Sequence, residues 1–264
     1  MLKRKYLFPE EGVIELNYQA GHRLGVNVYL IDGGDEYVLI DIGYLDAVDE
    51  IIDLIRRMDF SLSKCKMLIA THADADHVQG LARAQELLKT KVAAHPHSRK
   101  PIETGDEILT FARIDAQDIH LPMPPCKVDV LLNEGDIIQV GSRQLQVWYT
   151  PGHTKGQLSF KMGRLLFCGD NIFKDGCVGV IDAHHGSSIP DYIRSLERIR
   201  ADDSEFLLPS HGPAFRRDNV FLQKTIDRLK QYQTMADFGT CATHWPMLDA
   251  WEQDVISGRM PDFS

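Results

Sequence analysis

The stretch Thr71-His-Ala-Asp-Ala-Asp-His77 places four potential metal ligands within six residues. It directly follows Lys66–Ala70, a short apolar run that is typical of a buried strand. The two alanines are small, and alternate residues of an extended or tightly turned segment project together, so the ligands can converge without crowding. The pattern predicts a loop at a strand end that presents His72 and Asp74 to one metal ion and Asp76 and His77 to a neighbouring one.

An alternative interpretation is a polar loop in which Asp76 caps a helix that starts near Val78. Three further segments weigh against it, because each ends an apolar or β-rich run with a potential ligand beside a glycine. Backbone without a side chain can approach an ion closely, and loops at strand ends commonly carry function. The segments are Thr150-Pro-Gly-His-Thr154, Phe167-Cys-Gly-Asp-Asn171 and Leu207-Leu-Pro-Ser-His-Gly212, which contain His153, Asp170 and His211.

Taken in order, the motifs HxDxDH, TPGHT, GD and SHG resemble the metallo-β-lactamase superfamily, and the resemblance runs from about Val26 to His211. Leu39-Ile-Asp-Ile-Gly43 is similar to an early motif of that family. The resemblance implies that residues 1–264 form a single domain of the α/β class. Its fold would be a four-layer αββα sandwich of two mixed β-sheets flanked by helices, with the metals at one edge of the paired sheets.

The same resemblance implies a role for each candidate residue. One metal site would contain His72, Asp74 and His153, and the other would contain Asp76, His77 and His211. Asp170 would bridge the two ions. Asp41 would orient a metal ligand without binding metal itself, although a turn carboxylate at a strand end is an equally open interpretation for Asp41.

Asp74 departs from the family pattern, which usually has His at this position. A carboxylate is harder than imidazole and has a shorter reach, and hard ligands favour iron, manganese or magnesium relative to zinc. Flavodiiron oxygen reductases resemble this chain in having a carboxylate there, and they hold iron. We therefore expect two divalent ions, zinc by resemblance to the family, with iron or manganese as the alternatives that Asp74 favours. Asp74 would bind its ion directly if the loop moves inward, or through water.

These features favour a binuclear metal-dependent hydrolase in which a hydroxide that bridges the two ions attacks a small ester, thioester, lactone or phosphoester. Asp76 or water would pass a proton to the leaving group. The candidate substrate contacts are Tyr44, His184 and His185, with a solvated loop as the alternative for the two histidines. Other functions left open are a di-iron redox protein that reduces oxygen or nitric oxide, a single-iron oxygenase, and a non-enzymatic iron or oxygen sensor.

The composition narrows the class of partner. The formal net charge of −9, with no basic run beyond Lys3-Arg4-Lys5, argues against nucleic acid. No stretch approaches the ~20 apolar residues that span a bilayer, and the first residues lack the apolar run of a signal peptide. The five cysteines are scattered, which favours reduced thiols. We expect a cytoplasmic protein with a small-molecule substrate, and a homodimer remains open.

Periodicity predicts the elements around these motifs. Residues 98–127 contain four prolines and little periodicity, so we expect an irregular loop insertion with a short helix around 107–114. Residues 219–264 predict a helical C-terminal extension, with helices over 219–235 and within 243–258. His22, His95, His97, His120 and His244 are assigned to surface loops, and Cys168 to a buried strand. The other expected helices cover 46–58 (capped by Asp46), 78–88 and 190–199, and the other strands cover 26–31, 37–41, 66–70, 91–94, 128–132, 136–140, 144–149, 157–161, 164–168 and 205–208.

Overall fold

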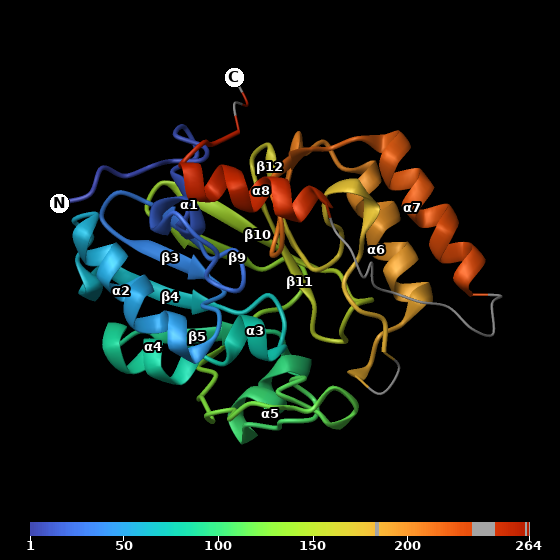
Figure 1. Cartoon of the computed structure of the whole chain (residues 1–264), viewed down its shortest axis with the longest axis horizontal. Helices are drawn as coiled ribbons and strands as arrows, with labels where there is room; N and C mark the ends of the chain where they lie inside the picture. Colours follow the sequence, from blue (N-terminus) through green and yellow to red (C-terminus); the bar gives the residue numbers. More distant parts are fainter. Residues whose placement is uncertain (183–184, 234–245, 262, 264) are drawn as a thin grey trace.

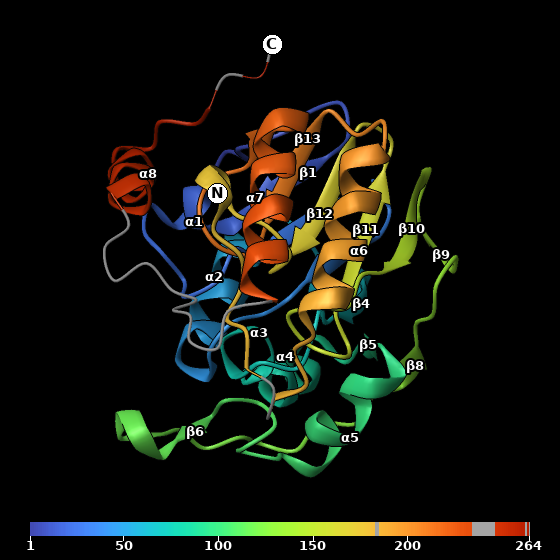
Figure 2. The same cartoon turned by 90° about the vertical axis from the view of Figure 1, so that its right-hand side faces the viewer.

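The structure, a computed structural model, describes residues 1–182, 185–233, 246–261 and 263. Within these residues two six-stranded sheets lie at the centre, and helices cover the outer face of each (Figures 1 and 2). The predicted four-layer αββα sandwich is therefore confirmed.

Both sheets are mixed, as predicted. In the first, the strands from β1 to β3 pair antiparallel, and the strands from β3 to β8 pair parallel. In the second, only β12 and β13 pair parallel. The first sheet runs in the order β1 (Val13–Glu15), β2 (Tyr29–Asp32), β3 (Tyr37–Ile40), β4 (Cys65–Ile69), β5 (Lys91–Ala94) and β8 (Val130–Leu131). The second runs in the order β14 (Phe215–Arg216), β13 (Phe206–Pro209), β12 (Leu165–Gly169), β11 (Leu158–Met162), β10 (Arg143–Tyr149) and β9 (Ile137–Val140).

Three apolar cores separate the four layers, and the strand sequences explain them. In β3, Val38 and Ile40 face the core between the sheets, whereas Leu39 between them faces the core under the first helical layer. In β12, Phe167 faces the core between the sheets, whereas Leu166 faces the second helical layer. Successive residues of a strand point to opposite faces, so a continuous apolar run predicts a strand that is buried on both sides.

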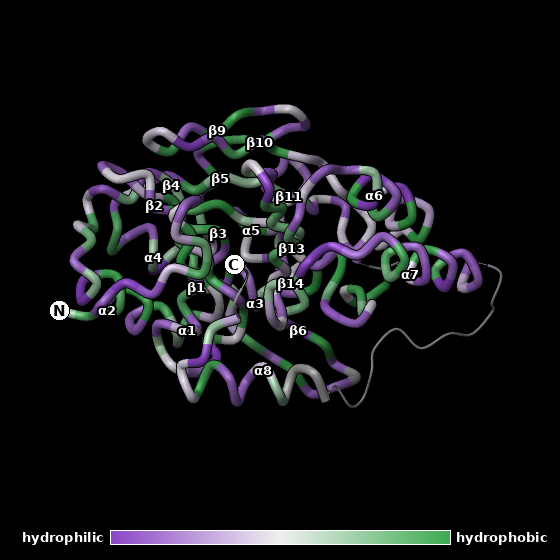
Figure 3. Tube along the Cα trace, turned by 90° about the horizontal axis from the view of Figure 1, so that it is seen from above, coloured by the Kyte–Doolittle hydropathy of each residue, from purple (hydrophilic) through white to green (hydrophobic). Residues whose placement is uncertain are grey.

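Helices α2 (Val48–Arg57) and α4 (Leu81–Leu88) cover the first sheet, and α6 (Ile189–Ala201) and α7 (Asn219–Tyr232) cover the second. Along α7 the chain alternates between hydrophilic and hydrophobic residues, as expected for a helix with one buried face (Figure 3). Asp46 does not cap α2, because a short 3-10 turn over Leu45–Ala47 precedes that helix and its N-cap position is Ala47.

The helix predicted over 78–88 is two helices, α3 (Ala75–Val78) and α4. Gly80 lies between them and donates its backbone NH to the carbonyl of Gly43 over 3.0 Å. A methyl group on Gly80 would lie only 2.4 Å from Cγ2 of Val48, so α2 and the loop before it can approach this closely only because the residue is glycine. Asp76 lies inside α3 and is not its N-cap, which is Asp74.

Segment 98–127 is more regular than expected. Helix α5 covers Pro96–Thr104, and a small hairpin joins β6 (Arg113–Ile114) to β7 (Ile119–His120). No regular helix forms over 107–114, because Asp106 accepts hydrogen bonds from the backbone of Ile108 and Leu109 and turns the chain.

His95 corrects a second expectation for this region, since it does not lie in a surface loop. Its ring is buried and stacks on Tyr149, with the ring centroids 4.4 Å apart. Burial lowers the pKa of His95 to about 4. His22, His97 and His120 are exposed and Cys168 is buried, as expected, but His97 lies in α5 and His120 in β7 and not in loops.

The C-terminal part that is described contains α8 (Pro246–Ser257), which runs beside α1 (Leu16–Ala20) (Figure 1). Trp251 on α8 donates its indole NH to the hydroxyl of Tyr18 on α1 over 2.9 Å. Residues 243–245 of the predicted last helix, with His244, lie outside the described residues. In the described parts of the chain, the helices are too short or too polar to cross a membrane.

Candidate metal centre

All seven ligands predicted from the sequence lie beyond the carboxyl ends of strands from both sheets. β4 leads into a short loop with His72 and Asp74 and then into α3 with Asp76 and His77, which together are four of the seven. β10, β12 and β13 of the second sheet lead to His153, Asp170 and His211. The same edge of a sheet is where α/β proteins generally bind ligands.

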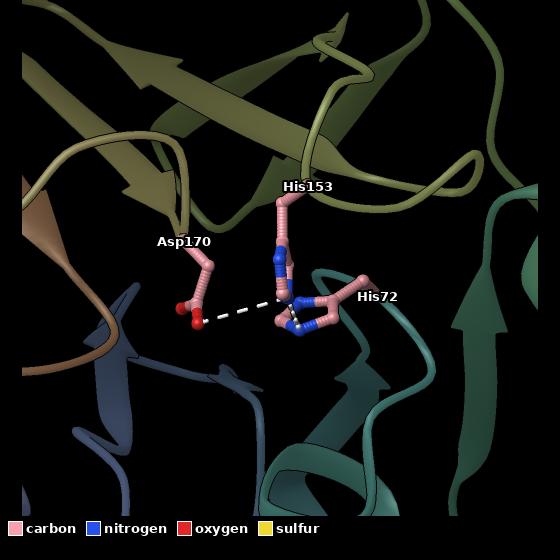
Figure 4. A group of neighbouring side chains, drawn as sticks. All are labelled: His72, His153 and Asp170. Atoms are coloured by element: carbon pink, nitrogen blue, oxygen red, sulfur yellow. Dashed lines mark hydrogen bonds and ion pairs between the residues drawn. The ribbon is translucent and has the colours of Figure 1, made fainter. Parts of the chain in front are cut away.

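The first cluster is built around His72 and His153, whose Nε2 atoms lie 3.2 Å apart. The Nδ1 atom of His72 contacts the Thr71 hydroxyl at 2.9 Å, and that of His153 contacts the carbonyl of Val180 at 2.8 Å. These contacts hold each ring by its outer nitrogen and turn the inner nitrogen toward its neighbour. Figure 4 shows the two rings and the Asp170 carboxylate pointing toward one another from the loops that follow different strands.

The second cluster brings together Asp76, His77 and His211. Oδ2 of Asp76 lies 3.3 Å from Nε2 of His77 and 3.1 Å from Nε2 of His211. The Asp170 carboxylate lies between the two clusters, with Oδ2 3.9 Å from Nε2 of His153 and 3.5 Å from Nε2 of His211. Asp170 is therefore the residue whose position suits a bridge.

The residues fit metal ions by two criteria. In each of the sets His72, His153, Asp170 and Asp76, His77, His211, the ligand atoms all lie within 4.8 Å of one another. Nε2 of His77 and Oδ1 of Asp170 are buried without a hydrogen-bond partner, although buried polar atoms are generally paired. Divalent cations would satisfy both atoms, and imidazole and carboxylate are the donors that zinc, iron and manganese accept.

Asp74 lies beside the first set and faces it. Its Oδ2 is 3.0 Å from Nε2 of His153 and 3.5 Å from Nε2 of His72. Its Oδ1 makes a short hydrogen bond with Nε2 of His185. The Asp74 side chain, although shorter than a histidine, therefore faces the cluster in the loop conformation that the structure shows.

The charges in the centre are strongly coupled. Burial alone would raise the pKa of Asp74 and of Asp76, but the neighbouring histidines hold both pKa values well below the usual range. Burial alone would lower the pKa of His77 and His153, but the facing carboxylates raise the first well above its usual value and the second to about 9. The pKa of His72 is lowered, by burial and then by the charge of His77. Without metal, protons on these rings balance the carboxylates, and metal ions would displace them.

Asp41 supports this centre from behind. Its carboxylate accepts the backbone NH of Thr71 over 2.8 Å and the Thr71 hydroxyl over 2.9 Å, and it contacts Nδ1 of His77. Sequence reasoning missed Thr71, whose only signal was its place directly before His72. It also missed Tyr192 on α6, which donates its hydroxyl to the carbonyl of Asp170 over 2.5 Å and carries no sequence signal.

The structure describes the surroundings of two of the three residues that were predicted to contact substrate, Tyr44 and His185. The Tyr44 side chain packs on Gly25, and its pKa is raised by burial and then by the charge of Asp76. The side chain of His185 is only 3% exposed, so the alternative of a solvated loop is wrong for this residue. His184 lies outside the described residues.

The metal centre is open to solvent on the side of the second cluster. The side chains of His211 and Asp76 are 20% and 25% exposed, whereas those of His72 and His77 are fully buried. Phe173 borders this side, with its ring edge-on to His211 and the centroids 5.5 Å apart. A ligand would therefore enter over Asp76 and His211.

A fold of two stacked mixed sheets with a histidine and carboxylate centre at the strand ends defines the class of protein. The family model of the metallo-beta-lactamase superfamily matches residues 22–211, and the chain belongs to this superfamily.

Known relatives agree with this assignment. The chain is 29% identical over 229 residues to the acyl-coenzyme A thioesterase MBLAC2 of Homo sapiens, covering 77% of this chain and 78% of the relative. It is 28% identical over 179 residues to a hydroxyacylglutathione hydrolase of Nitrobacter hamburgensis, covering 67% and 58%. The solved structure of TTHA1623 in a di-iron-bound form superposes with a TM-score of 0.60 at 29% identity, covering 72% of this chain and 89% of that one.

Proposed function

We propose that the chain is a binuclear metal-dependent hydrolase of acyl thioesters. The observation that carries the proposal is the place of Asp170 between two clusters of histidines and carboxylates, with buried ligand atoms that lack hydrogen-bond partners. Both named relatives support the substrate class, because an acyl-coenzyme A and a hydroxyacylglutathione each contain a thioester bond.

The proposed ligand set is the one that the motifs implied. His72, His153 and Asp74 would hold one ion, and Asp76, His77 and His211 the other, with Asp170 shared between them. A pair of divalent ions at such a site polarises a carbonyl oxygen and makes water acidic enough to ionise near neutral pH. Zinc, iron and manganese all suit these donors, and the additional carboxylate of Asp74 favours the latter two.

Other residues would position the substrate and move the proton. Asp76 is the most exposed of the carboxylates in the two clusters, so it is the group best placed to exchange a proton between solvent and the leaving thiolate. Tyr44 is protonated at neutral pH, as a tyrosine ordinarily is, and burial raises its pKa further, so its hydroxyl can donate a hydrogen bond to substrate. The buried first cluster would lie at the inner end of the entry path.

The proposal is tested by thiol release from a short acyl-coenzyme A and from an acylglutathione, compared with an oxygen ester, a lactone, a β-lactam and a phosphodiester. The chain is first loaded with zinc, iron or manganese separately. Thioester cleavage should exceed the other activities by at least tenfold, be abolished in His153→Ala, and be kept in His22→Ala, whose ring is exposed and pairs with Glu50. Preference for another bond, or thiol release that survives His153→Ala, would refute the thioester assignment. A visible absorption band with oxygen consumption and no hydrolysis would favour the redox alternative.

A further inference from the structure

The side chain of His185 reaches Asp74 at the metal centre from the segment between Asp170 and α6. It lies between β12 and α6, and its ring centroid is 6.3 Å from that of His153. Its Nε2 makes a short hydrogen bond with Oδ1 of Asp74. The other oxygen of Asp74 is the one that faces the first cluster, so the two carboxylate oxygens have separate partners.

The His185 ring is held firmly in this position. The Phe111 ring lies against it with the centroids 3.8 Å apart and the planes tilted by 35°. Phe111 has a φ of 53°, which is an unfavourable backbone conformation for a bulky residue. The chain thus accepts local strain at Phe111 while its ring covers the face of His185.

The backbone around His185 is tied to the loop of the first cluster. Ser187 donates its hydroxyl to the carbonyl of His153, and Ser188 donates its NH to the carbonyl of Gly152 over 2.9 Å. Gly152 itself must be glycine, because a methyl group there would lie 2.5 Å from Cα of Tyr192 at a φ of 149°. Any shift of this segment would therefore move His153 and His185 together.

One atom of His185 is not satisfied within the described structure. Its Nδ1 is buried and has no hydrogen-bond partner. Leaving a buried polar atom unpaired is unfavourable, so the burial of this imidazole is explained better by its Nε2 contact than by packing alone. An apolar side chain of similar size would fill the space beside Phe111 without that cost.

We propose that His185 is a positioning residue, whose Nε2 hydrogen donates to Oδ1 of Asp74 and turns Oδ2 toward the first ion. A carboxylate is shorter than the histidine usual at this position, and one of its oxygens would be free to rotate away. The hydrogen bond from His185 removes that freedom. The pair Asp74–His185 would therefore provide the metal ligand that a single histidine usually provides in the family. This inference rests on the proposed metal centre and does not depend on the thioester substrate.

The test measures metal affinity in the full chain after its metal has been removed. Zinc is added in competition with a coloured chelator, which resolves two binding steps in the wild type. His185→Ala should weaken one step by about 10–100-fold, the usual effect of losing a partner of a metal ligand, and leave the other unchanged. His185→Gln should restore most of the loss, because its amide can still donate to Asp74 but is a poor ligand. His22→Ala is the matched control and should bind as the wild type does.

A double-mutant cycle separates positioning from direct metal binding by His185. In an Asp74→Ala background, His185→Ala should have no further effect on either step, since its only route to the metal has been removed. A further loss in that background, or no rescue by His185→Gln, would mean that His185 binds metal itself, and the proposal would fall. Two steps of wild-type affinity in His185→Ala would also overturn it. If the wild type lacks two binding steps, the result refutes the binuclear metal centre and not the role of His185. The failure of one proposal can therefore be told from the failure of the other.

Discussion

Oδ2 of Asp41 lies 2.9 Å from Nδ1 of His77, although Asp41 directly follows β3 and His77 lies in α3. The carboxylate favours a hydrogen on Nδ1, which leaves the Nε2 lone pair of His77 directed into the second cluster. Asp41 has a φ of 58°, a conformation that Asp and Asn tolerate better than most residues. This backbone conformation at the end of β3 directs the Asp41 carboxylate toward His77.

Asp41→Asn should lower the affinity of the second metal step by about 10–100-fold, because an amide is a weaker acceptor for the Nδ1 hydrogen of His77. Asn tolerates the backbone conformation at this position, so the variant should fold. The chelator competition described above measures the effect. Unchanged affinity in both steps would show that His77 is oriented by its packing alone.

Asp74→His should shift metal preference. Replacing the carboxylate with imidazole removes a hard ligand, so the variant should contain a larger share of zinc than the wild type when both are produced in the same medium with equal zinc, iron and manganese. Elemental analysis of the purified proteins measures the ratio. The wild type and His22→Ala should have the same ratio. Equal ratios in the wild type and Asp74→His would mean that residue 74 does not contribute to either site.

Metal removal should destabilise the fold, because bound ions stabilise only the folded state. An ion present at 100 times its Kd adds about 2.7 kcal/mol, and two such ions correspond to a fall in Tm of roughly 10–20 °C for a chain of this size. Thermal unfolding before and after treatment with a chelator measures the shift, with chelator saturated with zinc as the control. An unchanged Tm would indicate that the purified chain holds no metal at this centre.

Glu15→Gln should change how stability depends on pH. Glu15 is fully buried, and burial raises its pKa to about 8 despite the hydrogen bond from Asn17. Between the unfolded pKa of about 4.5 and the folded pKa of about 8, the folded chain keeps a proton that the unfolded chain has lost. Stability therefore falls as pH rises through this window, by up to about 1.4 kcal/mol per pH unit.

Glu15→Gln is neutral throughout and keeps the oxygen that accepts from Asn17. Its unfolding free energy, measured by denaturant titration at several pH values, should exceed that of the wild type by an amount that grows between pH 5.5 and pH 8. Titration of the metal ligands affects both proteins equally and cancels in the difference. Parallel curves for the two proteins would contradict a protonated Glu15 in the folded chain.

The sequence by itself determined the fold class, the course of most strands and helices, and the residues that meet at one edge of the sheets. These features depend on local patterns, because apolar runs such as Leu165–Gly169 bury both faces of a strand and ligands that follow strands share an edge. It could not foresee the break at Gly80, the burial of His95 or the regular helix at 96–104.

Only the tertiary structure decided which distant residues are neighbours. The pairing of Asp74 with His185 spans 111 residues, and the place of Asp170 between the clusters depends on how the two sheets stack. Such proximities arise from the packing of whole layers and from loops tied together by backbone hydrogen bonds, such as Ser188 to Gly152. A local sequence pattern cannot predict these contacts, because they depend on interactions between residues that lie far apart in the chain.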